Sequence, residues 1–504
     1  IVFPQNVEVY RSSILLASYS YLKEAFDAIN DGTHNIGSFE IRIKGNIYEE
    51  NSAVLNASGT GGADYTSVKI FPTATGVSIT GNMAAPLIDL NGTSNVTIDG
   101  RVNASGGIKD MIIMNSNSSA TDGTSTIRMI DGASLNTVKY CILKGSASGS
   151  ASGIVLISTS AGTTGNNGNT FDNNNITSSS DDSRPLNAIY SSGSPGKDNS
   201  GDTLRNNNIF NNLNTAISSN GIYLAANNTG WTISGNSFYE SAPLVPTITA
   251  TYYVIRISSI AGVNYSVSNN FIGGSSPMCG GSALTKTNAS NNTFYGIYLS
   301  TGTGTVSNIQ NNIIRNINWS NSGNSTWTGI QIAGGDVNAG TITGNTIGSA
   351  TGTGSLIVTG GTTGNIVYGI NISGAGTISC RNNTIGSMTL ANANTNASNF
   401  YGINKSATAG TIIISNNTIG STSTAGSIRA SSLSTGNAQA VRGIYNAGTG
   451  AITISGNTIV NLTNSTTNAT TTTLGKINGI FSSSGTINTI TDNIIHHLTI
   501  SNAN

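Results

Sequence analysis

The sequence predicts an all-β protein, a right-handed parallel β-helix solenoid with a short N-terminal capping helix. The phrase AGTIIISNNTIGS at residues 409–421 returns as AGTISCRNNTIGS, which ends at Ser387. It alternates β-branched and polar residues, as a short strand does, and then turns at two asparagines. The chain has 504 residues, well beyond the size at which one compact core stops growing. A repeating body is therefore expected.

The N-terminal part differs from the repeats and predicts one helix. Residues 21–32, YLKEAFDAINDG, place four apolar side chains on one helix face: Leu22, Ala25, Phe26 and Ile29. Because a solenoid must cover its open end, we assign residues 1–50 to a cap and 51–504 to coils with variable loops on one side. Strands are expected first at 39–44, 67–71, 76–80, 87–90, 96–99 and 126–131.

A second repeated word, Gly-Ile, fixes the register of the later coils. The turn Asn lies 13 to 15 residues after each such Ile, whereas the number of residues from that Asn to the following Gly-Ile varies widely. Apolar residues three positions before the turn Asn and two positions after it are expected to face inward. These columns include Ile309, Ile342, Cys380, Ile414 and Ile454, followed by Ile314, Ile347, Ile385, Ile419 and Ile459.

The turn asparagines themselves predict a ladder. An Asn accepts the left-handed backbone conformation of a tight turn, and its amide can bond the identical amide one coil away. The predicted structural turn ladder contains Asn270, Asn312, Asn345, Asn383, Asn417 and Asn457.

Outward aromatic residues are the candidate binding surface. Four tyrosines follow inward Ile residues and should leave the same sheet face: Tyr190, Tyr223, Tyr298 and Tyr445. Such a row could form a platform for a sugar ring or a protein partner, or it could only stack on itself and stabilise the sheet. The three tryptophans are expected near turns or in loops, where they could extend this contact face: Trp231, Trp319 and Trp327.

Composition excludes several functional classes. Only 8% of residues are charged and the formal net charge is zero, which argues against a basic nucleic-acid groove and an acidic calcium-buffering surface. The three cysteines predict isolated thiols rather than a disulfide framework. No apolar run of about 18 residues is present, so no membrane span is expected.

Both ends of the sequence suggest a longer parent. Residue 1 is Ile rather than Met, so we expect that a leader has been removed or that this is a fragment. The last strand-like segment, Leu498–Ile500, has no cap of its own. Because an uncapped end exposes strand edges, the native chain should continue or this end should be paired.

The segment YLKEAFDAINDGTHNIGSFEIRIKGNIYEENSAVLNASG, followed by coils of the GIY and TISGN type, resembles a known family. It is similar to the right-handed parallel β-helix proteins, pectate-lyase-like in fold, on the outer surface of gliding and predatory bacteria. The resemblance implies an extracellular protein exported by the type IX route that serves as an adhesin or surface filament. The C-terminal sorting domain of such proteins is not visible in this sequence.

An enzymatic function is the main alternative, because the fold also hosts polysaccharide lyases and hydrolases. Such enzymes need paired carboxylates, or a calcium-holding acidic cluster with a base. The strongest polar cluster was interpreted either as such a site or as solvated loop charges: Asp172, Asp181, Asp182, Arg184, Lys197, Asp198, Asp202 and Arg205. Beyond residue 250 only Asp336 and Asp492 are acidic. We therefore expect no catalytic residue, no metal site and no cofactor.

The predicted function is that of a non-catalytic structural and adhesive module of a cell-surface adhesin or filamentous contact appendage. Expected partners are further copies of the chain, a larger surface assembly, surface glycans or another cell. Nucleic acid is not expected as a partner. The alternative is a polysaccharide-active lyase or hydrolase, or a carbohydrate-binding β-helix.

Overall fold

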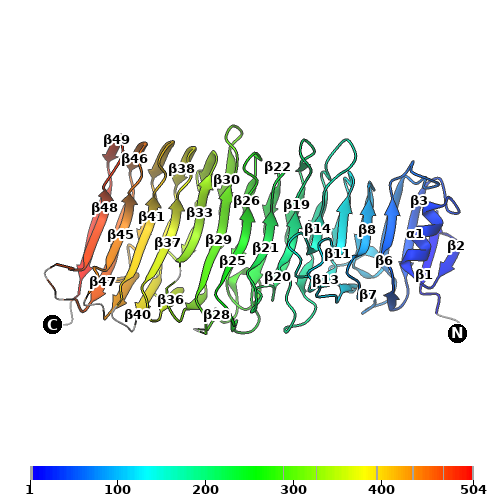
Figure 1. Ribbon diagram of the computed structural model, residues 1–504, viewed down its shortest axis with the longest axis horizontal. Coiled ribbons are helices and arrows are strands. Elements are labelled where there is room, and N and C mark those ends of the chain that lie inside the picture. Colours follow the sequence, from blue (N-terminus) through cyan, green and yellow to red (C-terminus); the bar gives the residue numbers. More distant parts are fainter. Residues whose placement is uncertain are drawn as a thin grey trace. The chain divides into compact units, whose positions relative to one another are not determined.

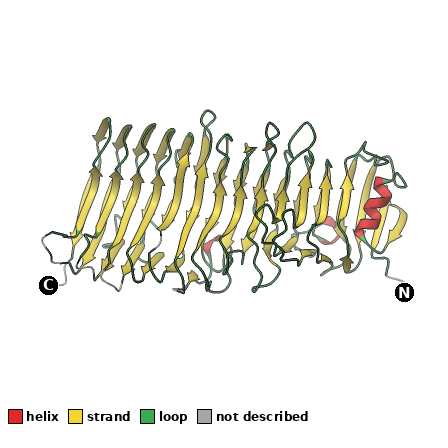
Figure 2. Cartoon of the chain, in the orientation of Figure 1, coloured by secondary structure: helices red, strands yellow, loops and turns green. Residues whose placement is uncertain are grey.

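The computed structural model describes residues 4–287, 289–324, 326–392, 396–433, 436–468, 470 and 472–501. The chain divides into two compact units, which we call unit 1 (Ile1–Asn214 and Asn220–Asn236) and unit 2 (Thr215–Ser219 and Ser237–Asn504). In each unit, strands of successive coils pair in parallel and form three sheets, called A, B and C (Figures 1 and 2). The predicted fold class, an all-β parallel β-helix with a short N-terminal helix, is confirmed.

Unit 1 contains the first six to nine strands of each sheet. Sheet A runs in the order β2 (Ile14–Tyr19), β1 (Val7–Arg11), β3 (Ser38–Ile43), β6 (Ser67–Pro72), β9 (Val96–Asp99), β12 (Thr137–Lys139), β15 (Thr170–Asp172), β19 (Thr203–Arg205) and β23 (Thr232–Ser234). Sheet B contains β4 (Ile47–Glu49), β7 (Ser78–Gly81), β10 (Ile112–Asn115), β13 (Ile142–Gly145), β16 (Asn175–Ser178) and β20 (Asn208–Phe210). Sheet C contains β5 (Ala53–Asn56), β8 (Pro86–Asn91), β11 (Ser125–Ile130), β14 (Gly153–Ile157), β17 (Asn187–Ser191) and β21 (Ser219–Leu224). A small parallel pair joins β18 (Asn199–Ser200) and β22 (Asn228–Thr229).

Unit 2 continues the same pattern with longer strands. Its sheet A contains β26 (Ser266–Ser268), β30 (Ser307–Gln310), β34 (Val337–Ala339), β38 (Thr377–Arg381), β42 (Thr411–Ser415), β46 (Ala451–Ser455) and β49 (Ile487–Thr491). Its sheet C contains β25 (Ala250–Ile257), β29 (Asn292–Ser300), β33 (Thr326–Gly334), β37 (Asn365–Ile372), β41 (Ser398–Lys405), β45 (Ala440–Asn446) and β48 (Lys476–Ser482).

Sheet B of unit 2 consists of two runs that merge in its last strands. One run contains β24 (Ser237–Tyr239), β27 (Phe271–Ile272), β31 (Ile313–Ile314), β35 (Thr346–Gly348), β39 (Thr384–Gly386) and β43 (Thr418–Gly420). The other contains β28 (Leu284–Lys286), β32 (Ile317–Ser320), β36 (Leu356–Gly360), β40 (Met388–Asn392) and β44 (Ile428–Ser432). Both runs pair with β47 (Thr458–Thr466), and β47 pairs with β50 (Ile494–Ile500).

The predicted helix is present as α1 (Leu22–Asn30), and its apolar face is buried. The Glu24 side chain accepts the backbone N–H groups of Ser20 and Tyr21, which caps the first turn. Strand β1 pairs antiparallel with β2 and β3, whereas parallel pairing starts between β3 and β6. Two 3₁₀ turns complete the element set, η1 (Val102–Ala104) and η2 (Pro277–Cys279).

The core consists of the predicted inward columns, except in the last described coil, where Ile490 and Ile495 are 45% and 42% exposed, and at one further position. Ile309, Ile414 and Ile454 are fully buried, and the three cysteines are buried free thiols. Ile342, however, is 82% exposed, so its predicted inward position is wrong. Five residues separate Ala339 from the turn Asn345, whereas the coil after it has only two between Cys380 and its turn Asn. The register pairs Ala339 with Cys380, which leaves Ile342 in an enlarged turn.

The Gly-Ile word marks a place where neighbouring coils approach closely. A Cβ added to Gly402 would lie 2.5 Å from the backbone oxygen of Gly443 and 2.7 Å from Ile419. The same close approach recurs at five other glycines of this word. A Cβ added there would lie 2.5 to 2.7 Å from the backbone oxygen of the matching glycine one coil further on, or from an adjacent Ile: Gly296, Gly329, Gly369, Gly443 and Gly479. Only glycine leaves room for this approach, which explains why the word repeats.

Candidate functional site

The six asparagines of the predicted turn ladder are joined in one continuous row within unit 2. At every step from Asn270 to Asn457, the Nδ2–H group donates to the Oδ1 of the next asparagine at 2.9 Å. Each of these oxygens also accepts a backbone N–H group from the neighbouring coil. The row extends to Asn493. These side chains are at most 1% exposed, so their hydrogen-bonding capacity serves the fold and not a ligand.

Unit 1 contains two shorter ladders of the same kind. One joins Asn174 and Asn207 to Asn236, and the other runs from Asn136 through Asn169 to Asp202. Asp202 accepts both the backbone N–H and the Nδ2–H of Asn169, at 2.7 and 3.0 Å. Burial raises the pKa of Asp202 well above its usual range.

The four tyrosines of the candidate binding surface do not form one row. In unit 1, Tyr190 and Tyr223 meet edge to face with ring centroids 5.4 Å apart. In unit 2, Tyr298 makes edge-to-face contacts with Tyr253 and Tyr295, with ring centroids 5.4 and 5.6 Å apart. Tyr445 stacks between two other rings, those of Tyr401 and Phe481. Each tyrosine therefore belongs to a local cluster.

The larger feature is an outward stripe on sheet C of unit 2. We call the following residues the aromatic stripe: Tyr253, Arg256, Tyr295, Tyr298, Tyr368, Tyr401, Arg442, Tyr445 and Phe481. Registered pairing places Tyr295, Thr328 and Tyr368 side by side on consecutive strands, and Thr328 is fully buried between its neighbours. Four tyrosines of the stripe were not predicted from the sequence: Tyr253, Tyr295, Tyr368 and Tyr401. They precede the Gly-Ile word or its equivalent, whereas the predicted surface contains only residues that follow it.

Most rings of the stripe stack on each other. The rings of Tyr253 and Tyr295 are 8° from parallel with centroids 4.8 Å apart, and Tyr368 and Tyr401 are 22° from parallel at 5.3 Å. Because side chains stand roughly perpendicular to a sheet, stacked rings turn their edges and hydroxyl groups outward. The mutual stacking considered from the sequence is therefore present, and it occupies the ring faces that a sugar platform would need.

The tryptophans do not extend this surface, which corrects the prediction that they would. Trp231, Trp319 and Trp327 are all fully buried. The indole N–H of Trp231 donates to the Asn199 carbonyl at 2.9 Å. Within unit 2, Trp319 and Trp327 pack on the inward ring of Phe294, with centroids 4.9 and 5.4 Å away. The large apolar area of an indole ring favours its burial inside the coil, even where the surrounding sequence is rich in turn residues.

The charged cluster considered as a catalytic site is divided among separate places in unit 1. Asp172 pairs with Arg205 on sheet A at 3.0 Å, whereas the exposed Asp181 lies 3.8 Å from the buried Arg184. Lys197 donates to two backbone carbonyl groups, and Asp202 is buried in its ladder. The structure therefore brings these groups together only as pairs or as parts of the scaffold.

Other classes of site were also searched for in the described part of the chain. No group of three or more His, Cys, Asp or Glu side chains there could hold a metal ion. Among the same residues, no helix is long and apolar enough to cross a membrane.

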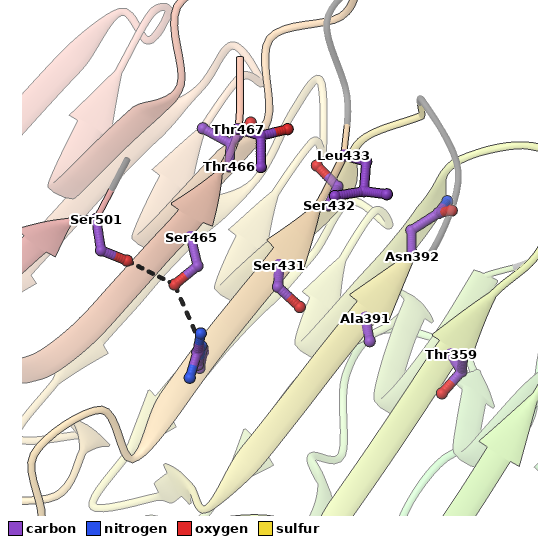
Figure 3. A pocket seen from close by; sticks show the side chains of 11 residues that line it. Thr359, Ala391, Asn392, Ser431, Ser432, Leu433, Ser465, Thr466, Thr467 and Ser501 are labelled. Carbon is purple, nitrogen blue, oxygen red and sulfur yellow. Dashed lines mark hydrogen bonds between the residues drawn. The ribbon is translucent and has the colours of Figure 1, made fainter. Parts of the chain in front are cut away.

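A shallow groove of about 510 Å³ lies on the outer face of sheet B in unit 2 (Figure 3). Its floor is a column of small side chains on four consecutive strands and on the residue that follows β50: Thr359, Ala391, Ser431, Ser465 and Ser501. The hydroxyl of Ser465 bonds that of Ser501 at 2.8 Å and accepts the Arg429 Nε–H at 3.2 Å. The groove offers hydroxyl groups and one cation, and none of its lining residues is an acid.

Like Lys405, Lys286 is a fully buried cation of unit 2. It donates to the Ser320 carbonyl at 2.6 Å, to Asn321 Oδ1 at 2.7 Å and to the Ser290 carbonyl. Burial lowers the pKa of Lys286 to about 7. This side chain joins neighbouring loops from inside and is closed to a ligand.

A scan against protein-family models finds no match to this chain, and a search of curated proteins finds none either.

Proposed function

We propose that the chain is an extracellular structural and adhesive module, part of a cell-surface adhesin or filamentous contact appendage, and that it catalyses no reaction. The observation that carries this proposal is the use of polar side chains. The buried amides run from coil to coil in ladders, and within the strongest charged cluster Asp172 pairs with Arg205 while Asp202 belongs to a ladder.

This arrangement suits a mechanical role. In unit 2, successive coils from β26 to β49 are bonded through backbone pairing and through the amide row, so a load on them is shared by many bonds. Surface chemistry is left to outward side chains, which can change without disturbing the ladders. An adhesive module needs this separation between a stiff body and an adaptable face.

Electron microscopy of the native material, with measurement of mass per length, tests the proposal. Regular fibres or surface appendages that contain the chain are the expected result. Isolated particles together with release of unsaturated or reducing sugar ends from polysaccharides, with calcium and with chelator, would overturn it and favour the enzyme alternative. Inactive isolated particles without surface attachment would overturn it as well.

A further inference from the structure

The outer face of sheet C in unit 2 carries cations and no carboxylates. Its seven strands, β25, β29, β33, β37, β41, β45 and β48, contain no Asp or Glu at all. The two arginines of the aromatic stripe, Arg256 and Arg442, lie on this face. In sheet C of unit 1, by contrast, Arg128 forms a bidentate pair with Asp89 at 2.7 and 2.9 Å. The strands of this face in unit 2 thus supply no carboxylate of their own to Arg442.

Arg442 is held in place by rings. Its guanidinium carbon lies 4.2 Å from the ring centroid of Tyr445 and 4.4 Å from that of Phe481. None of the ion pairs found among the described residues involves Arg442, and its buried Nε has no hydrogen-bond partner. A rigid guanidinium fork without a carboxylate is preorganised for a carboxylate ligand.

The stacked rings add to this preference. A ring is electron-poor at its edge, so a row of outward edges attracts negative charge rather than the apolar face of a neutral sugar. The phenol hydroxyls stay protonated and can donate, because burial raises the pKa of Tyr368 to about 12 and raises those of Tyr295 and Tyr401. The stripe thus presents donors and positive edges on most of its strands.

A second row of donors runs beside the rings. Asn371 donates to Gln331 Oε1 and Asn404 donates to Asn371 Oδ1, each at 2.7 Å. An amide nitrogen carries two hydrogens, and only one bond of the partly exposed Asn371 Nδ2 is accounted for, so its other hydrogen can reach a ligand. The register aligns Asn404 with Tyr445, which joins the amide row to the ring cluster around Arg442.

We propose that the aromatic stripe of unit 2 binds a linear carboxylated polysaccharide of the uronic-acid type. Donors recur on successive strands, about 4.8 Å apart, so the ligand that fits best is a polymer with its own regular repeat of acceptors and charges. Arg442 takes a carboxylate, and the phenol and amide rows take hydroxyl groups on either side. The inference rests on the proposed adhesive function and names the chemistry of the surface to which the module adheres.

Calorimetric titration of the full chain with alginate oligosaccharides tests this assignment, with carboxyl-reduced oligosaccharides of the same length as the neutral probe. Arg442→Gln should weaken alginate binding about tenfold or more, since hydrogen bonds to charged groups contribute about 1.5–3 kcal/mol. Arg381→Gln is the matched control: it removes one positive charge from sheet A, where Arg381 Nε donates to Ser379. It should leave binding within about twofold. Tyr401→Phe and Tyr445→Phe, which remove one hydroxyl each, should weaken binding severalfold.

Three results would overturn the assignment: no binding of alginate, equal binding of the carboxyl-reduced probe, or equal loss in Arg442→Gln and Arg381→Gln. The last would show general attraction to a basic unit. Attachment of the chain to cells or surfaces, measured in parallel, separates the two proposals. If attachment persists while alginate binding is absent, only the ligand is wrong; if attachment and surface appendages are both absent, the adhesive function itself fails.

Discussion

At the scale of single residues, position in the coil decides what a polar side chain does. Asn383 and Asn371 are both amides of unit 2, yet Asn383 is fully buried in the turn ladder and Asn371 belongs to an outward row. The ladder could be predicted because the turn asparagines recur at one place in a repeated phrase. The outward row was not predicted, although Gln331, Asn371 and Asn404 each follow a Gly-Ile word, because only the tyrosines at that position were considered as a surface.

Replacing Asn383 by Ala should lower the free energy of unfolding of unit 2 by about 3 kcal/mol. The substitution leaves the backbone N–H and the Nδ2–H of Asn345 without their acceptor, and each buried unpaired donor costs about 1–3 kcal/mol. Urea unfolding followed by fluorescence of the buried tryptophans measures the change. Thr422→Ala, on an exposed turn, is the control and should alter stability by less than about 0.5 kcal/mol. Equal stability of the two variants would contradict a structural role for the ladder.

At the scale of elements, the Gly-Ile word shows how a strand is fitted to its neighbours. Gly402→Ala would bring a Cβ to 2.5 Å from the Gly443 oxygen, a contact that backbone atoms cannot avoid without a shift of the strand. Overpacking of this kind costs about 1–3 kcal/mol, so we expect unit 2 to lose roughly that amount in urea unfolding. Gly436→Ala serves as the control, since no heavy atom lies within 4 Å of its Cβ position. A neutral Gly402→Ala variant would show that the coils are more loosely stacked than the structure has them.

The junction between α1 and the first coil should depend on pH. Glu49 of β4 is 1% exposed and accepts the backbone N–H of Leu22 at 2.6 Å, and burial raises its pKa to about 7. Because the folded pKa lies above the unfolded value, this junction is most stable below about pH 4.5 and loses stability as the pH rises through 7. The loss is at most about 3 kcal/mol.

Hydrogen exchange of the α1 amides between pH 5 and pH 8, corrected for intrinsic rates, measures this effect. Glu49→Gln keeps an acceptor without the charge and should remove the loss. His34, whose pKa is lowered by burial, acts in the opposite direction near the same helix, but it contributes equally to both proteins and cancels in the comparison. Identical pH profiles for the two proteins would show that Glu49 stays in one protonation state over this range.

The elements also mark the limit of what sequence alone could predict. Helix α1 and the Ile columns followed from periodicity, which local sequence records directly. The position of Ile342 could not be predicted in this way, because its enlarged turn keeps the repeated sequence pattern but carries the residue outward. The charged cluster shows the same limit: Asp202 lies in an inward ladder position whereas Asp172 pairs with Arg205 on sheet A, and their spacing in the sequence shows neither.

At the scale of the whole molecule, zero net charge conceals two opposite units. Unit 1 contains 18 acidic and 13 basic residues, and unit 2 contains 3 acidic and 8 basic residues. Opposite excesses of five charges on one chain favour association between copies, in which the acidic unit of one meets the basic unit of another. The scarcity of acidic residues beyond residue 250 is one side of this asymmetry, and the two opposite excesses cancel in the total.

Self-association should therefore weaken steeply with salt. The Debye length falls from about 30 Å at 0.01 M to about 10 Å at 0.1 M ionic strength, so attraction between whole units is screened over this range. Sedimentation velocity at matched protein concentrations should show oligomers at the lower salt and mainly monomers at the higher. The double variant Arg381→Gln with Arg429→Gln lowers the excess of unit 2 from five charges to three and should shift the transition to still lower salt. Oligomers that persist unchanged at 0.1 M in both proteins would instead require an apolar contact, and the exposed Ile487, Ile494 and Ile500 of the last described coil would be the place to seek it.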